Sequence, residues 1–118
     1  MTAEELSNII VQGMEDKKAS DIIVMDLREI THTVTDFFVL CSGNSDTQVE
    51  AIADAVEEAV WKANQEHPWK SEGKTHKQWV LIDYVNVVAH VFLKERRSFY
   101  GLEDLWGDAK IIRVAESR

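Results

Sequence analysis

The chain has 118 residues, of which 45% are hydrophobic and 29% are charged, and this is the composition of a single globular domain. At this length about two thirds of the unfolded surface is buried on folding, so a core forms without disulfides or a structural metal. The 21 Asp and Glu residues outnumber the 13 Lys and Arg residues and give a net charge of −8, which argues against nucleic acid as the main partner and favours a basic protein. The single Cys excludes an internal disulfide, and no apolar run approaches the ~18 to 20 residues of a membrane span.

The first 41 residues predict one helix followed by a β-hairpin. Thr2 and Glu5 form a capping-box pattern, and apolar residues then recur at helical spacing, which predicts a helix over 3–17. Two mostly apolar runs, 21–27 and 37–41, are typical of buried strands. Because the connection between them is short and polar, we expect the two strands to pair as a hairpin and not through a crossover.

A second and longer helix is expected after a break in the chain at residues 42–45. Ser45 and Gln48 repeat the capping pattern, and apolar residues at helical spacing extend this helix over 46–65. Pro68 ends the region, and a short edge strand is expected over 68–71. The outer face of the helix carries a series of acidic residues, for which solvation is the simplest explanation: Asp46, Glu50, Asp54, Glu57 and Glu58.

The last third of the chain predicts a second hairpin and a short helix. The runs 79–83 and 87–93 are typical of strands, and the three residues between them suit a hairpin turn. Residues 94–106 have helical composition, whereas 108–118 are mixed and are expected to form a frayed tail, although its two isoleucines could dock. This order of elements predicts one α/β or α+β domain over 1–107, with a mixed sheet of about five strands and the helices packed on it.

The turn Gly43–Ser45 lies where a strand runs into a helix, a place where unpaired backbone N–H groups bind anions in many nucleotide enzymes. It lacks the glycine spacing and the lysine of phosphate-binding loops, so capping and a tight turn explain it better. Nucleotidyl transfer also needs carboxylates one residue apart to hold two metal ions, and neither Asp26 nor Asp83 has an acid two positions on. We therefore expect no catalytic, cofactor-binding or metal-binding residues.

Cys41 and the histidines could in principle serve as a catalytic nucleophile with its base, or as metal ligands. The sequence favours structural roles for them. Cys41 closes an apolar strand, where a small buried hydrophobe is usual, and a nucleophile there would need a base such as His32 or His90 in reach. His90 lies inside a predicted strand, so a partly buried, hydrogen-bonded histidine is expected. The histidines show none of the short spacings of a metal site: His32, His67, His76 and His90.

Aromatic residues are spread over the strands and the helix expected in the last third: Trp79, Tyr84, Phe92, Phe99, Tyr100 and Trp106. Several of them must be core, but both faces of the strands 79–83 and 87–93 are largely apolar. If helices cover only one side of the sheet, part of this surface is left for a partner, and Trp, Tyr and Arg often carry interface energy. Core and interface are about equally favoured for this cluster.

A series of motifs stands in a fixed order along the chain: Asp36–Ser45 (DFFVLCSGNS), Gln48-Val49, Ala51–Asp54, Trp79–Tyr84, Val87-Val88, His90–Phe92, Arg97, Phe99-Tyr100, Leu102-Glu103 and Leu105-Trp106. Together they resemble the ribosomal silencing factor, or RsfS/Iojap, family. The match runs from about Leu6 to Trp106 with compatible spacing, and no single motif carries it.

The resemblance implies a nucleotidyltransferase-like α/β fold without catalysis, in agreement with the missing carboxylate pair. It also implies a translational repressor that binds the large ribosomal subunit through ribosomal protein fourteen and sterically blocks the small subunit, which damps translation when nutrients are short. The acidic charge suits a basic ribosomal protein. The family's signature residues, carried over position by position, give the expected contact region: Trp79, Asp83, Tyr84, His90, Arg97, Tyr100, Leu102, Glu103, Leu105 and Trp106.

Other readings of the sequence stay open. The same docking site would serve a large-subunit assembly factor, and a second copy could cover the apolar sheet and give a homodimer. A nucleotide-binding or nucleotidyl-transfer enzyme would use the Gly43–Ser45 turn with an unusual acid set such as Asp83 with Asp26 or Asp36. The acidic face of the helix 46–65 is expected to be the solvent side that meets the small subunit. The initiating Met and the early helix favour a bacterial cytoplasmic protein over one with a targeting segment.

Overall fold

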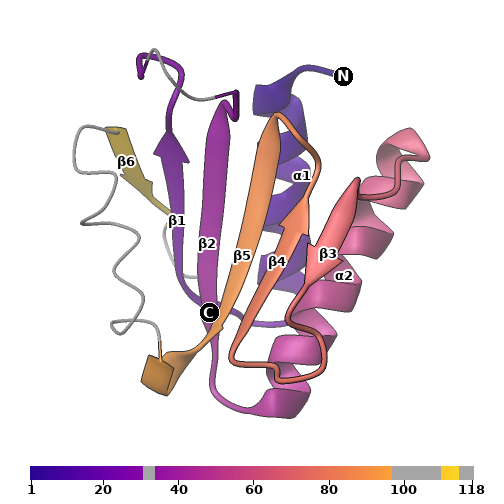
Figure 1. Cartoon of the computed structure of the whole chain (residues 1–118), viewed down its shortest axis with the longest axis vertical. Coiled ribbons are helices and arrows are strands. Elements are labelled where there is room, and N and C mark those ends of the chain that lie inside the picture. Colours follow the sequence, from indigo (N-terminus) through magenta and orange to yellow (C-terminus); the bar gives the residue numbers. More distant parts are fainter. Residues whose placement is uncertain (31–33, 97–109, 115–118) are drawn as a thin grey trace.

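A computed structural model of the chain describes residues 1–30, 34–96 and 110–114. Within these ranges the chain forms two α-helices, a six-stranded sheet and one short 3-10 helix (Figure 1). The elements in chain order are α1 (Ala3–Asp16), β1 (Ser20–Asp26), β2 (Phe37–Gly43), α2 (Asp46–Asn64), β3 (Lys70–Glu72), β4 (Trp79–Asp83), β5 (Val87–Leu93), η1 (Lys94–Arg96) and β6 (Lys110–Arg113). The two predicted helices, the edge strand and both hairpins are therefore confirmed to within a few residues.

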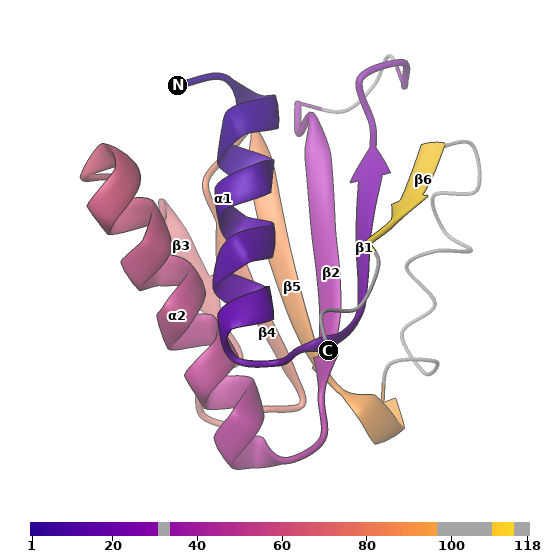
Figure 2. The ribbon, with the colours of Figure 1, turned by 180° about the vertical axis from the view of Figure 1, so that it is seen from behind.

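The sheet is mixed and has the strand order β3-β4-β5-β2-β1-β6. Strands β2 and β5 run parallel, and every other neighbouring pair is antiparallel. Both long helices lie on one side of the sheet, which is clear when the molecule is seen from behind (Figure 2). The predicted α/β class is confirmed, and the other face of the sheet carries neither α1 nor α2.

Local sequence signals set the start of each helix and the end of α2. Thr2 and Glu5 form the reciprocal capping box at the start of α1, with each side chain bonded to the other residue's backbone N–H at 3.1 Å. Ser45 caps α2 by accepting a hydrogen bond from the N–H of Gln48. Gln65 ends α2 in the left-handed conformation, with φ of 53°.

The main core lies between the sheet and the two helices. Buried apolar residues of α1, including Ile10 and Met14, meet fully buried residues of α2 such as Ile52 and Val56. At Gly13 an added Cβ would lie 3.0 Å from the carbonyl oxygen of Ala55 and from the Cα of Val56, so α1 and α2 approach closely there. We refer to this layer as the helix-side core; residues from β1, β2, β4 and β5 complete it.

The C-terminal segment differs from the expectation of a frayed tail. Residues Lys110–Arg113 pair antiparallel with β1, with Ile111 opposite Met25 and Ile112 opposite Val24. Without this strand the outer edge of β1 would leave its backbone N–H and C=O groups unpaired, and the β-branched isoleucines suit a strand. The expectation of fraying is therefore wrong for these four residues, and the sheet has six strands.

Only the beginning of the helix expected over 94–106 lies among the described residues. Lys94–Arg96 forms one turn of 3-10 helix directly after β5. Residues 97–106 lie outside the described part of the chain.

Two residues of the acidic face of α2 form ion pairs with a neighbouring loop. Glu57 pairs with Lys74, and Glu50 pairs with Lys77 at 2.9 Å, both from the loop between β3 and β4. Hydrogen bonding to Lys77 lowers the pKa of Glu50. The loop thus neutralises part of this face, while Asp46, Glu50, Asp54 and Glu58 are exposed, as expected of a solvated face.

Candidate functional site

The side of the sheet away from α1 and α2 is the candidate surface, and we call it the helix-free face. Side chains alternate along each strand, so the register places one residue in two from each strand on this face. Its central part is Ile23 and Met25 from β1, Phe38, Leu40 and Ser42 from β2, Trp79, Leu81 and Asp83 from β4, and Val88, His90 and Phe92 from β5. Three of the expected contact residues, Trp79, Asp83 and His90, therefore lie on one surface.

An aromatic cluster forms the centre of the helix-free face. The Trp79 ring stacks on Phe92 with ring centroids 5.4 Å apart, and the His90 ring meets the Phe38 ring edge-on at 4.8 Å. A hydrogen bond of 2.9 Å from the Trp79 indole Nε1 to His90 Nδ1 ties the cluster together. Phe92 and His90 are buried, whereas Trp79 and Phe38 are half-buried. The buried rings form a rigid floor, and the half-buried ones are within a partner's reach.

The environment of His90 keeps its side chain neutral. Burial lowers the pKa of His90 to about 3. Because Nδ1 accepts the hydrogen bond from Trp79, the ring proton lies on Nε2. Among the described residues Nε2 has no hydrogen-bond partner. His90 is therefore hydrogen-bonded, as the sequence predicted for a structural histidine, but it is buried and not partly buried.

Asp83 and Tyr84 are neighbours in the chain but point to opposite sides of the sheet. Asp83 ends β4 on the helix-free face, and its Oδ1 accepts a hydrogen bond of 2.7 Å from the N–H of Val85. Tyr84 is buried in the helix-side core, and its hydroxyl has no hydrogen-bond partner among the described residues. Burial raises the pKa of Tyr84 far above its usual range. Tyr84 is thus not brought together with Trp79, Asp83 and His90.

The other expected contact residues lie outside the described part of the chain: Arg97, Tyr100, Leu102, Glu103, Leu105 and Trp106. Phe38, in contrast, belongs to the aromatic cluster although the sequence analysis did not single it out. Its alternation with the buried Phe37 and Val39 along β2 indicates that it points to the opposite face from them, but the parallel pairing of β2 with β5 is what places it beside His90.

The turn between β2 and α2 already uses its polar groups within the chain. The N–H of Asn44 donates to Gln48 Oε1 at 2.6 Å, and the N–H of Gln48 donates to Ser45 Oγ at 3.2 Å. The Gln48 side chain also donates to the carbonyl oxygens of Lys17 and Lys18. These bonds are those of a helix cap locked to the preceding turn, and they compete with a phosphate for the Asn44 and Gln48 amides.

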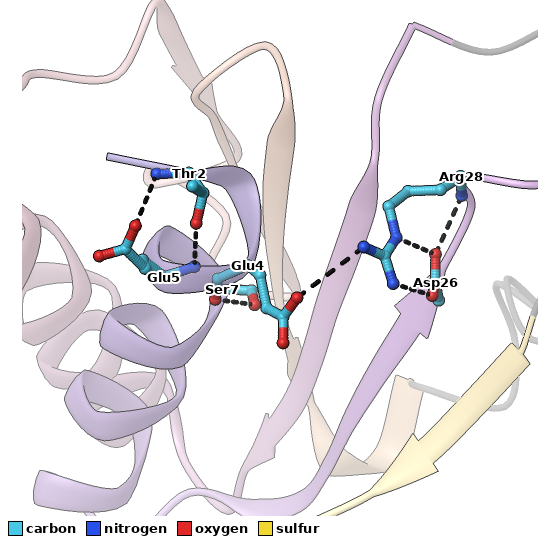
Figure 3. Close-up of polar contacts among 6 residues, drawn as sticks. All are labelled: Thr2, Glu4, Glu5, Ser7, Asp26 and Arg28. Atoms are coloured by element: carbon cyan, nitrogen blue, oxygen red, sulfur yellow. Dashed lines mark hydrogen bonds and ion pairs between the residues drawn. The ribbon is translucent and has the colours of Figure 1, made fainter.

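Asp26, one of the acidic residues considered for catalysis, is engaged by an arginine. Asp26 receives two side-chain hydrogen bonds from Arg28, at 2.7 and 3.0 Å, and Glu4 of α1 lies 3.8 Å from the same guanidinium (Figure 3). Hydrogen bonding from Arg28 lowers the pKa of Asp26. Across residues 1–30, 34–96 and 110–114, no group of three or more His, Cys, Asp or Glu residues could hold a metal ion.

Cys41 lies in the helix-side core, on the opposite side of β2 from the His90 ring. The arrangement of thiol and base that a cysteine nucleophile needs is therefore not formed with His90. None of the helices in the described part of the chain combines the length and apolar character needed to cross a membrane.

Comparison with known proteins assigns the chain and its fold to a family. The family described as "Ribosomal silencing factor during starvation" matches residues 1–118. The ribosomal silencing factor RsfS of Bacillus subtilis is 41% identical over 111 residues, which are 94% of this chain and 92% of that protein. A crystal structure of protein CV0518 from Chromobacterium violaceum superposes with a TM-score of 0.85 at 33% identity, covering 100% of this chain and 98% of that one.

A more distant relative carries a different name. The mouse protein "Mitochondrial assembly of ribosomal large subunit protein 1" is 30% identical over 102 residues, which are 84% of this chain and 44% of that protein. The full-length family match and the close relatives together show that the chain belongs to the ribosomal silencing factor (RsfS/Iojap) family, whose members are non-enzymatic, bind the ribosome and silence translation.

Proposed function

We propose that the chain represses translation by binding the large ribosomal subunit through large-subunit ribosomal protein fourteen, and that its bulk keeps the small subunit from joining. The proposal rests on one observation above all: an aromatic cluster, fixed by a hydrogen bond, lies on the sheet face that the two helices leave uncovered. A cluster of this kind in an acidic protein suits a basic protein partner.

Trp79 is the side chain on this face best suited to anchor a partner. Its ring is half-buried, it is stacked on Phe92, and its N–H is already bonded to His90. A large ring held in place before binding loses little conformational entropy on association. Phe38, Leu81 and Asp83 lie on the same face and are also half-buried. We therefore place the centre of the contact at Trp79.

The dimensions of the fold support a steric mechanism. The described chain measures 36 × 33 × 29 Å along its principal axes. Atoms at a protein interface approach to ~4 Å, so a bound body of this thickness prevents another large particle from contacting the surface beneath it. No chemical step is required, in keeping with a non-enzymatic family.

The test is co-sedimentation of the purified chain with isolated large subunits, comparing Trp79→Ala with Trp61→Ala. Trp61 is a matched control because it is an exposed tryptophan on α2, stacked on His67 and on the other side of the sheet. An anchor residue contributes about 2 kcal/mol or more, so we expect Trp79→Ala to raise Kd about thirtyfold and Trp61→Ala to leave it unchanged. Equal affinities of both variants and the wild type would contradict the proposed contact.

A role in assembly of the large subunit is the second candidate, and the name of the mouse relative favours it. The same surface would serve both roles, so the maturity of the bound particle distinguishes them. Retention on precursor particles but not on mature subunits would favour assembly over repression.

A homodimer and a cytoplasmic location complete the proposal as further expectations. A second copy seated on the helix-free face would compete with the ribosome for Trp79. Light scattering of the purified chain with and without large subunits tests this competition, because a dimer that persists in the bound state would leave the face covered.

A further inference from the structure

Several exposed apolar side chains gather at one end of the sheet. Val34, Trp69 and Val85 are 85%, 70% and 51% exposed, and we call them the apolar rim. Two hydrogen bonds connect the segments that carry them. Thr35 Oγ1 donates to the carbonyl oxygen of Val85 at 3.1 Å, and the N–H of Trp69 donates to the carbonyl oxygen of Asp83 at 2.7 Å. The rim residues thus flank the same end of the sheet, where β4 ends and β2, β3 and β5 begin.

Val85 occupies a backbone conformation that valine rarely adopts. Its φ is +75°, and the N–H of Asn86 donates to the carbonyl oxygen of Tyr84 at 3.0 Å. These features define a γ-turn with a positive central φ, a rare and strained turn. A β-branched residue is an outlier there, because its Cβ crowds the neighbouring carbonyl oxygen. Glycine has no Cβ and adopts this conformation without steric strain.

The surrounding structure holds the strained turn in place. Asp83 Oδ1 accepts from the N–H of Val85 at 2.7 Å, and the N–H of Tyr84 donates to the carbonyl oxygen of Val87 at 2.9 Å. The carbonyl oxygen of Asn86 accepts hydrogen bonds from two backbone N–H groups at the start of β2, those of Asp36 and Phe37. Val85 is nonetheless 51% exposed, so burial in the core does not explain why valine occupies the turn.

We propose that the apolar rim is a protein-docking surface continuous with the helix-free face, and that the γ-turn presents Val85 as a contact residue for the same large-subunit ribosomal protein. This inference rests on the proposed function. Continuity supports the choice of occupant, because Asp83 lies on the helix-free face and also holds the turn. An exposed apolar edge suits a protein surface and not a phosphate backbone.

The first test is Val85→Gly, which relieves the strain and removes the apolar side chain. We expect a higher midpoint of urea unfolding together with about a tenfold weaker affinity for large subunits, the loss that corresponds to one buried valine side chain. Val34→Ser tests the rim without altering the γ-turn; we expect unchanged stability and a severalfold weaker affinity. Lower stability of Val85→Gly would overturn the strain argument.

The outcomes separate this inference from the proposed function. If Trp79→Ala weakens binding while Val85→Gly and Val34→Ser bind like the wild type, the rim inference is overturned and the proposed function stands. If the wild type does not bind large subunits, both fall. If the rim variants instead turn a dimer into a monomer with unchanged subunit affinity, the occupant is a second copy of this chain, and the inference is again overturned.

Discussion

Mild acid provides a quantitative test of the buried histidine on the helix-free face. Burial lowers the pKa of His90 to about 3 in the folded protein, while an unfolded histidine titrates near 6.5. As the pH falls below about 6.5, the unfolded chain binds a proton at His90 that the folded chain does not bind. The stability contributed by the neutral ring is therefore complete above that pH and is lost as the pH falls toward the folded pKa.

The magnitude follows from these two pKa values. At pH 5 the unfolded histidine is almost fully protonated and the folded one is neutral, so the free energy of unfolding drops by about 2 kcal/mol between pH 7 and pH 5. This figure changes little for any folded pKa below about 4, because the folded ring is then still neutral at pH 5. For a domain of this size the change lowers Tm by roughly 6 to 10 °C.

The assay is urea unfolding of the wild type and of His90→Phe at pH 7 and pH 5. Other titrating groups contribute equally to both proteins, so the difference between them isolates His90. We expect the wild type to lose about 2 kcal/mol more than His90→Phe on acidification. A difference below about 0.5 kcal/mol would refute the burial and neutrality of His90, since ~0.5 kcal/mol is the error of such comparisons.

Three further predictions concern single contacts. Trp79→Phe keeps an aromatic ring but leaves His90 Nδ1 buried without its donor. Thermal unfolding should therefore show that the free energy of unfolding falls by about 2 kcal/mol. A fall below about 0.5 kcal/mol would contradict the hydrogen bond. Gly73 has a φ of +88°, and Gly73→Ala would place a Cβ 1.9 Å from the carbonyl oxygen of Trp79. Urea unfolding should therefore show that the free energy of unfolding falls by about 2 to 4 kcal/mol. A variant as stable as the wild type would refute this geometry. Arg28→Gln should raise the depressed pKa of Asp26. The Asp26–Arg28 pair stabilises the fold above the unfolded pKa of Asp26, and this contribution is lost as the pH falls through the folded pKa. Urea unfolding between pH 6 and pH 3 should therefore show a smaller loss of stability for Arg28→Gln than for the wild type, and equal losses would argue against the pair.

Periodicity and capping signals were sufficient to predict most of the elements. The capping box at Thr2, the cap at Ser45 and the two hairpins are local features, each set by residues close together in the chain. The sixth strand was not predicted, because Lys110–Arg113 is a four-residue segment that pairs with β1, more than 80 residues away in sequence. Only the tertiary fold provides that partner.

The assignment of residues to the candidate site depended on information that the sequence does not contain. Both faces of β4 and β5 are apolar, so the pattern could not show which face the helices would cover. Tyr84 follows Asp83 directly and therefore points to the helix-side core, whereas Trp79 and His90 share the helix-free face. The positive φ at Val85 was not predicted from the sequence either, because Tyr84-Val85-Asn86 contains no glycine.

The most direct test of the central claim is co-sedimentation of the purified chain with isolated large and small subunits, scored for retention and for the amount of joined ribosomes. We predict retention on the large subunit alone, together with fewer joined particles, and loss of both effects with Trp79→Ala. Retention that leaves subunit joining unchanged, or no retention on the large subunit, would contradict repression by steric block.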